Sequence, residues 1–248
     1  MTSSIINVKE AKTVSEGRGV TVHRLFPTND FMKFDPFALF DEFIVEKPAG
    51  FPLHRHSGFE FITYMIEGSL KHRDSIGNEM TVNEGGAQRA ITGTGIEHSE
   101  MPVSEGVNRG IQLWISLPRR FRERNPEYQI FEPDDLPIRT SQGLKAKIIA
   151  GEDSPLQTSI QIDFLDITLN EGKIYKGKIP DNYNTLLYIL YGEIEIEGNA
   201  FTSNKAALLR AGSNLKAKMK TKSRFLYLSG KPLNEEYRVS GSSVIYIK

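Results

Sequence analysis

Short runs of β-branched and aromatic residues recur along the chain, and each run ends near glycine, asparagine, aspartate or proline. One run covers residues 59–66 and ends at Glu67-Gly68, and the next covers residues 70–74 and ends at turn residues 75–78. This pattern is typical of β-sandwiches and β-barrels. The helical period is nearly absent, and the one short helix that the sequence predicts lies at 133–136, where proline and aspartate favour a first turn. The sequence therefore predicts an all-β fold.

The chain also carries an internal repeat. Residues 64–70 (YMIEGSL) resemble residues 188–194 (YILYGEI), at an offset of 124 in a chain of 248 residues. Repetition at half the chain length predicts two similar β-barrels in tandem. We therefore expect one barrel at 1–125 and a second at 126–248, with the connection between them in the region 118–143.

Three of the five histidines fall in two short polar motifs. His54 and His56 form an H-x-H, and His98 with Glu100 forms an H-x-E, each beside a predicted strand. Because successive strand residues alternate sides, both members of each motif project to one face. Three imidazoles and one carboxylate that converge inside a barrel form a first-row transition-metal site with open coordination positions. We predict a metal site made of these four residues.

The second half of the chain lacks such a set. Adding the offset of 124 to the four candidate ligands gives Lys178, Pro180, Lys222 and Arg224, and the second half contains no histidine. Lysine and arginine do not ligate a cation near neutral pH. We therefore expect the metal only in the first barrel, with the second barrel as its structural partner.

The ligand types restrict the metal. Imidazole and carboxylate without thiolate suit Fe(II), Mn, Co, Ni, Cu or Zn, and do not favour Ca or Mg. A closed structural zinc site would be rich in cysteine, and the chain has none. Four protein ligands leave about two positions of an octahedron for water, O₂ or a bidentate substrate. An open site of this kind predicts chemistry or sensing.

Other polar residues near the motifs are secondary candidates. Glu60 shares the strand parity of His54 and His56, and a hydrogen bond to a ligating imidazole is favoured over direct ligation. Gln88 is a candidate on similar grounds, although an amide bonded to backbone is the simpler explanation. His72, in a charged stretch before a turn, is expected to be solvated or paired across strands, and His23 to be packed or hydrogen-bonded.

Two further features are expected to be structural. Trp114 lies in an apolar run and is predicted to belong to the core, and the basic residues of 119–124 are predicted to form a solvated linker face.

Composition excludes several classes of protein. Lys plus Arg and Asp plus Glu number 31 each, so the chain has no electrostatic footprint for nucleic acid or anionic membranes.

No secretory signal is evident, no apolar run approaches ~20 residues, and the lack of cysteine fits a reducing interior. No P-loop, nucleophile elbow or dinucleotide fingerprint is present. We expect a cytoplasmic protein that binds neither nucleic acid directly nor a membrane.

Several blocks, in order, resemble the pirin family of the cupin superfamily. In the N-terminal half the resemblance is specific, and it is carried by residues 35–37, 41–43, 51–60, 72–78, 95–102, 112–114 and 126–129. In the C-terminal half it is looser, through residues 154–155 and 188–192.

This resemblance implies a bicupin, that is, two tandem jelly-roll-like barrels of which the C-terminal one has lost its metal. It implies that His54, His56, His98 and Glu100 bind one Fe ion. Some pirins look like quercetin 2,3-dioxygenases, which open the flavonol heterocycle with O₂ and release carbon monoxide. Others act as iron-dependent transcriptional co-regulators or bind metabolic enzymes.

The sequence departs from the family pattern around the ligands. Arg55 stands where proline is common, Ser57 and Thr94 where arginine is common, and residues 86–89 (GAQR) replace a Gly-Asp-x-Gln-Trp region. The ligands are kept, whereas the rim of the pocket is altered.

Two main hypotheses follow. In the first, the chain is a dioxygenase of a flavonol-like or other enolic substrate, with Fe(II) as the favoured metal and Glu100 as catalytic base. In the second, it is a non-catalytic iron-binding redox sensor or regulatory protein that acts through protein partners, since fold alone does not fix function. A degenerate cupin with a purely structural metal is a third hypothesis. We expect a monomer, because a tandem barrel pair can bury its sheets without a second chain.

Overall fold

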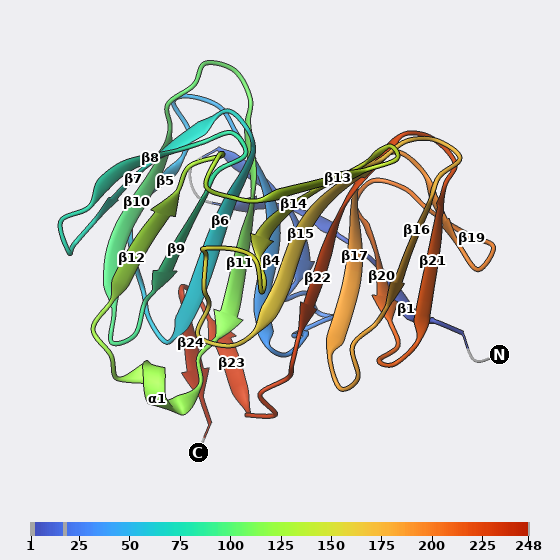
Figure 1. Ribbon diagram of the computed structural model, residues 1–248. Coiled ribbons are helices and arrows are strands. Elements are labelled where there is room, and N and C mark those ends of the chain that lie inside the picture. The colour runs from blue at the N-terminus through green and yellow to red at the C-terminus, as the bar shows by residue number, and fades with distance from the viewer. Residues whose placement is uncertain (1–2, 17–18, 248) are drawn as a thin grey trace. The chain divides into compact units, whose positions relative to one another are not determined.

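The computed structural model describes residues 3–16 and 19–247, and these residues are almost entirely β (Figure 1). They form 24 strands and one short helix, α1 (Arg119–Arg122). The all-β prediction is confirmed. The chain separates into two compact units. The first barrel consists of residues 12–135 with the C-terminal segment from 233 onward, and the second barrel consists of residues 136–232 with the N-terminal segment up to residue 11.

The first barrel contains two antiparallel sheets and a terminal hairpin. Its seven-stranded sheet runs, in spatial order, β12 (Glu127–Phe131), β9 (Ala87–Ile91), β6 (Phe59–Glu67), β11 (Asn108–Ser116), β4 (Phe37–Val45), β3 (Val20–Phe26) and β2 (Lys12–Glu16). Its four-stranded sheet runs β5 (Phe51–His56), β10 (Ile96–Pro102), β7 (Ser69–Asp74) and β8 (Glu79–Asn83). The hairpin is formed by β23 (Tyr237–Ser240) and β24 (Ser243–Tyr246).

The second barrel repeats this plan. Its seven-stranded sheet runs β1 (Ile5–Glu10), β20 (Lys205–Leu209), β17 (Asn184–Tyr191), β22 (Ser223–Gly230), β15 (Ile162–Leu169), β14 (Leu144–Ala150) and β13 (Ile138–Ser141). Its four-stranded sheet runs β16 (Ile174–Lys178), β21 (Asn214–Met219), β18 (Ile194–Ile196) and β19 (Asn199–Phe201). The strand orders correspond position by position, so the internal repeat is a duplicated barrel.

The boundaries of the two units differ from the contiguous halves 1–125 and 126–248 that the repeat suggested. Strand β1 pairs with β20 and fills the edge position in the second barrel that β12 fills in the first. The C-terminal hairpin in turn bridges to the first barrel at Ser57 and Ser243. Each unit therefore includes a segment from the opposite end of the chain.

The predicted helix at 133–136 is wrong. These residues form a turn, in which Asp135 N–H donates to the Glu132 carbonyl at 3.0 Å and the Asp135 carboxylate accepts from Glu132 N–H at 2.8 Å. The aspartate that suggested a helix start instead closes a turn, as Asx residues commonly do.

The core of each barrel lies between its sheets. Strand β6 is buried at eight of its nine positions, which explains its nearly continuous apolar sequence, because a central strand covered on both faces does not alternate. Trp114 is 6% exposed and packs with Phe59 and Phe61, which confirms its predicted place in the core. None of the helices among the described residues has the length and hydropathy needed to cross a membrane.

Gly110 on β11 tests this packing. An added Cβ would lie 2.7 Å from the Tyr64 carbonyl oxygen and closer still to the ring of Phe43. We expect Gly110→Ala to lower the free energy of unfolding by about 1–3 kcal/mol, measured by urea denaturation, because overpacking forces neighbours to shift. Gly177→Ala is the matched control, since its Cβ would meet only Tyr175 at 3.9 Å. Equal effects of the two substitutions would contradict the packing described.

Candidate metal centre

Two neighbouring strands of the four-stranded sheet bring the candidate ligands together. Strand β5 carries His54 and His56, and the antiparallel strand β10 carries His98 and Glu100. His98 lies directly opposite His54 in the ladder. Strand alternation then directs the four side chains to the inner face, where His56, His98 and Glu100 are buried.

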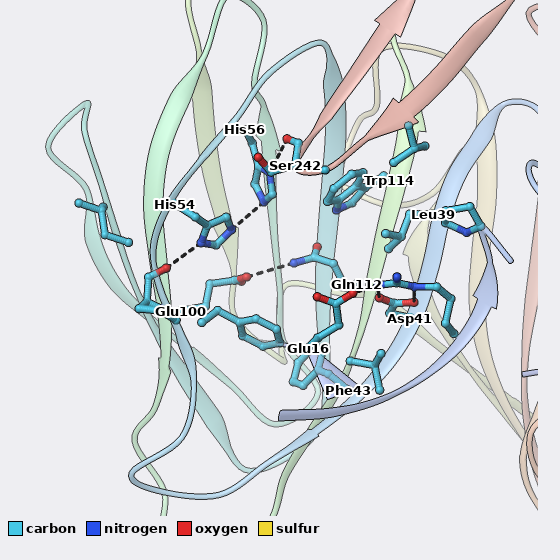
Figure 2. Close-up of a pocket in the computed structure, with 18 residues that line it drawn as sticks. Glu16, Leu39, Asp41, Phe43, His54, His56, Glu100, Gln112, Trp114 and Ser242 are labelled. Carbon is cyan, nitrogen blue, oxygen red and sulfur yellow. Dashed lines mark hydrogen bonds and ion pairs between the residues drawn. The ribbon is translucent and has the colours of Figure 1, made fainter. Parts of the chain in front are cut away.

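The three imidazoles meet at their Nε2 atoms. His54 Nε2 lies 2.9 Å from His56 Nε2 and 3.1 Å from His98 Nε2. One nitrogen from each ring falls within a mutual distance of 4.8 Å, the spacing of a group that can hold one metal ion. Figure 2 shows His54 and His56 side by side at one end of a pocket.

Backbone carbonyls fix the protonation of two of these rings. His54 Nδ1 lies 2.7 Å from the Pro52 carbonyl oxygen, and His56 Nδ1 lies 2.9 Å from the Ser242 carbonyl oxygen. A carbonyl only accepts, so each Nδ1 must carry the hydrogen. In a neutral imidazole the other nitrogen, Nε2, then presents a lone pair. These two lone pairs face each other.

The third ring is held by a buried chain of side chains. His72 Nε2 lies 3.1 Å from Asp74 Oδ2, and His72 Nδ1 lies 3.4 Å from His98 Nδ1. The Asp74 carboxylate accepts a hydrogen bond from His72 Nε2–H, so in the neutral ring His72 Nδ1 has no hydrogen. His72 Nδ1 therefore accepts a hydrogen bond from His98 Nδ1–H. His98 Nε2 is thereby left with its lone pair. Such carboxylate–histidine contacts behind a ligand orient it and raise its basicity.

Of the two expectations for His72, pairing across strands is confirmed by its contact with His98 on the neighbouring strand, whereas a solvated position is wrong. His72 is 0% exposed, and its ring stacks on Tyr128 with centroids 4.3 Å apart. Its charged neighbours in sequence point outward, whereas strand parity turns His72 and Asp74 inward.

Burial keeps two of the three imidazoles neutral. Desolvation is the main cause that lowers the pKa of His56 to about 3, and it also lowers the pKa of His98 well below its ordinary value. Protons therefore do not compete for the Nε2 lone pairs of His56 and His98 near neutral pH. A cation placed among them would remove their mutual repulsion, so the donor set fits a metal ion.

The types of donor restrict the metal more than their spacing does. Three imidazole nitrogens with no thiolate suit several first-row divalent ions. The triad is therefore compatible with Fe, Mn, Co, Ni, Cu or Zn.

Glu100 lies beside the triad but outside the group of mutually close donor atoms. Its Oε1 accepts from Thr63 Oγ1 at 2.9 Å and from the Gln88 amide. Its Oε2 accepts from Gln112 Nε2 at 3.0 Å (Figure 2). Burial raises the pKa of Glu100 to about 7, even though these hydrogen bonds favour the carboxylate.

The secondary candidates take different places. Gln88 donates to Glu100 and accepts from Tyr128 OH at 2.9 Å, so it supports the carboxylate and not a backbone group. Glu60 is fully buried and pairs with Arg89; it lies outside the triad's group. His23 hydrogen-bonds Thr13 Oγ1 at 3.3 Å, away from the centre.

The second barrel has apolar residues at the equivalent positions. On β21, Ala217 faces Tyr175 as His98 faces His54, and Met219 occupies the position of Glu100. These residues, which strand pairing identifies, are the true equivalents of the ligands. The residues expected from the constant offset of 124, Lys178, Pro180, Lys222 and Arg224, are not. A constant offset fails because loop lengths differ between the repeats.

A pocket of about 550 Å³ opens beside the triad. Its walls are mostly apolar, and they include Val22, Leu39, Phe43 and Trp114. At the end away from the histidines lie three charged side chains (Figure 2). There Arg24 binds Asp41 at 2.6 and 2.9 Å and pairs with Glu16 at 2.7 Å.

Several parts of the centre are absent from the residues predicted by sequence, among them the His72–Asp74 pair and the Ser242 carbonyl. His72 and Asp74 share the inward parity of their strand, and this parity is the signal that could have found them. The Ser242 carbonyl has no such signal, because a backbone acceptor 186 residues from His56 leaves no mark in the side-chain pattern.

Each barrel matches a known family of protein domains. The family model described as Pirin matches residues 15–115, and the model described as Pirin C-terminal cupin domain matches residues 164–245. A pirin-like protein of Solanum lycopersicum is 36% identical over 247 residues, which cover 96% of this chain and 85% of the relative.

Solved structures share the fold. A quercetin 2,3-dioxygenase from Acinetobacter baumannii has a TM-score of 0.91 at 26% identity, covering 100% of this chain and 93% of its own. The Escherichia coli pirin YhhW, solved in complex with nickel(II), has a TM-score of 0.78 at 20% identity, covering 92% of this chain and 99% of its own. At that identity the second likeness shows the fold alone.

The raised pKa of Glu100 predicts a pH effect on the metal-free protein. Its folded pKa of about 7 exceeds the ordinary 4.5, so its contribution to stability is full below 4.5 and is lost as pH rises through 7. Glu100→Gln stays neutral and does not suffer this loss. We therefore measure the free energy of unfolding of both proteins by urea denaturation in the presence of a chelator. We expect the difference, variant minus wild type, to increase from pH 5 to pH 8. A difference independent of pH would contradict the assignment.

Proposed function

We propose that this chain, which belongs to the pirin family, is a metal-dependent dioxygenase. In this proposal it opens the heterocycle of a flavonol such as quercetin with O₂. The observation that carries the proposal is the meeting of three imidazole Nε2 atoms beside a buried carboxylate, at one end of a substrate-sized pocket. The likeness to the A. baumannii quercetin 2,3-dioxygenase supports the choice of reaction.

His54, His56 and His98 would hold the ion, with Glu100 as the fourth ligand. Nitrogen and carboxylate donors without thiolate suit Fe(II), and Mn, Co, Ni, Cu and Zn are alternatives. When bound, such an ion supplies a Lewis acid that acidifies a coordinated hydroxyl and a redox partner for O₂.

Glu100 is proposed as the base that takes the proton of the substrate hydroxyl. In the metal-free protein the pKa of this carboxylate is raised to about 7, and a base works best when its pKa lies near the working pH. Because a bound cation would lower this pKa, Glu100 would act as the base while partly detached from the ion. Thr63 and Gln112 hold its two oxygens in place, so the carboxylate is oriented before the substrate arrives.

The pocket favours a flat aromatic substrate with polar groups at both ends. Leu39 and Phe43 line its walls, which exclude water from the reacting groups. Asp41 and Glu16 at the far end offer carboxylate oxygens that accept from phenolic hydroxyls. A volume of about 550 Å³ falls within the range of pockets that hold drug-sized ligands.

The metal site is tested by His98→Ala. We expect the variant to lose its bound metal and its turnover together, because one of three converging donors is removed. The measurement is elemental analysis of purified protein with O₂ uptake in the presence of quercetin. His23→Ala is the matched control and should keep both, since His23 lies away from the centre. Turnover by metal-free His98→Ala would contradict the proposal.

The role of Glu100 is tested by Glu100→Gln. We expect O₂ uptake with quercetin to fall by about 10²–10⁴-fold, the usual contribution of a general base. Elemental analysis of the variant after reconstitution with each candidate metal separates loss of the base from loss of the ion. If the wild type shows no turnover with any metal, the dioxygenase proposal fails, and the iron-binding sensor or regulator remains.

A further inference from the structure

We propose that the C-terminal hairpin, formed by β23, β24 and the turn at 241–242, is a positioning part of the metal centre. Its docking holds His56 in the orientation and protonation form that metal binding needs, so docking of the hairpin and binding of the ion stabilise each other. The inference rests on the proposed metal site.

The contact that carries the inference is the one between His56 and Ser242. The Ser242 carbonyl accepts from His56 Nδ1–H at 2.9 Å and leaves Nε2 free to face His54 Nε2. If the carbonyl moved away, Nδ1 would lose its acceptor inside a buried site, and the ring would be free to rotate or to change tautomer. The donor set is therefore complete only while the hairpin is docked.

The hairpin also grips the chain immediately after His56. Ser243 forms a parallel bridge with Ser57, Val244 N–H donates to the Ser57 carbonyl at 3.0 Å, and the two serine hydroxyls lie 2.9 Å apart. Gly58 has a φ of +83°, and an added Cβ there would collide with the Val244 carbonyl oxygen. Ser57 and Gly58, the two residues that follow β5, are thus both in contact with the same hairpin.

Anchors remote from the triad hold the hairpin in place. Tyr246 OH donates to the Gly58 carbonyl at 3.1 Å and accepts from Leu117 N–H. The Arg122 guanidinium lies 3.3 Å from the centre of the Tyr246 ring and pairs with Glu235. Arg122 is therefore an anchor, which corrects the expectation of a solvated linker face for this residue.

Apolar contacts complete the docking. Tyr237 and Val244 are 6% and 4% exposed, and they pack in a cluster with Leu39, Phe59 and Trp114. Val239, Gly241 and Ser242 also line the pocket. One short segment therefore supports a ligand, closes part of the core and forms a pocket wall.

These contacts imply a thermodynamic linkage. An ion bound at His56 Nε2 favours the Nδ1–H tautomer and hence the bond to Ser242, and coupling between two such events is reciprocal. Groups that orient a ligand from behind typically change metal affinity by about 10–100-fold when removed.

The test uses Tyr246→Phe, which removes one oxygen and leaves every ligand unchanged. In titrations of the full chain with Ni²⁺, we expect the affinity of the variant to be about tenfold weaker than that of the wild type. Tyr188→Phe is the matched control, because it removes a buried phenol that bonds Asn204 at 3.4 Å in the second barrel. We expect its Ni²⁺ affinity to equal that of the wild type.

Hydrogen exchange of the wild type supplies a second readout that needs no variant. We expect Ni²⁺ to slow exchange in peptides covering 237–247, including the Val244 amide, relative to the metal-free protein. Peptides of β16 and β21 in the second barrel serve as the internal reference. This measurement keeps the inference testable if Tyr246→Phe does not fold.

The outcomes separate the inference from the proposed function. If the wild type binds no Ni²⁺, the proposed metal site fails and the inference falls with it. If the wild type binds Ni²⁺ but exchange in 237–247 is unchanged, the inference alone is overturned. Wild-type affinity in a folded Tyr246→Phe whose hairpin exchanges faster would overturn it as well.

Discussion

The centre of the first barrel depends on two backbone carbonyls that accept from the outer nitrogens of two histidines. The Pro52 and Ser242 carbonyls each accept a hydrogen bond from an Nδ1–H. The Nε2 atoms of His54 and His56 therefore present lone pairs to each other. The chain from Asp74 through His72 does the same for His98. Three converging lone pairs form an arrangement that a cation stabilises.

Comparison of the two barrels shows which interior residues the shared strand order does not require. Both barrels have the same strand order, yet the second places Tyr175, Ala217 and Met219 where the first places ligands. Its interior is a continuous apolar cluster. A barrel of this plan can therefore be filled by apolar residues, and the buried polar side chains of the first barrel carry a desolvation cost that the second barrel avoids.

Strand alternation explains how much of the site can be predicted from sequence. It is enough to assign His54, His56 and His98 to one inner face, and the repeat predicts the paired barrels. The same parity applies to His72 and Asp74, but their charged neighbours suggest a solvated edge. The exchange of terminal strands and the Ser242 contact could not be predicted, because each depends on pairing between residues distant in sequence. The short helix was misplaced because Asp135 closes a turn as readily as it starts a helix.

The most direct test of the account is nitrogen NMR of the histidine side chains during a Zn²⁺ titration, since Zn²⁺ is diamagnetic. Before metal is added, we expect His54 and His56 to carry their hydrogen on Nδ1. At one equivalent of Zn²⁺, the Nε2 resonances of His54, His56 and His98 should shift together while His23 stays unchanged. Hydrogen on Nε2 of both His54 and His56 in the metal-free protein, or a Zn²⁺ response confined to His23, would contradict it.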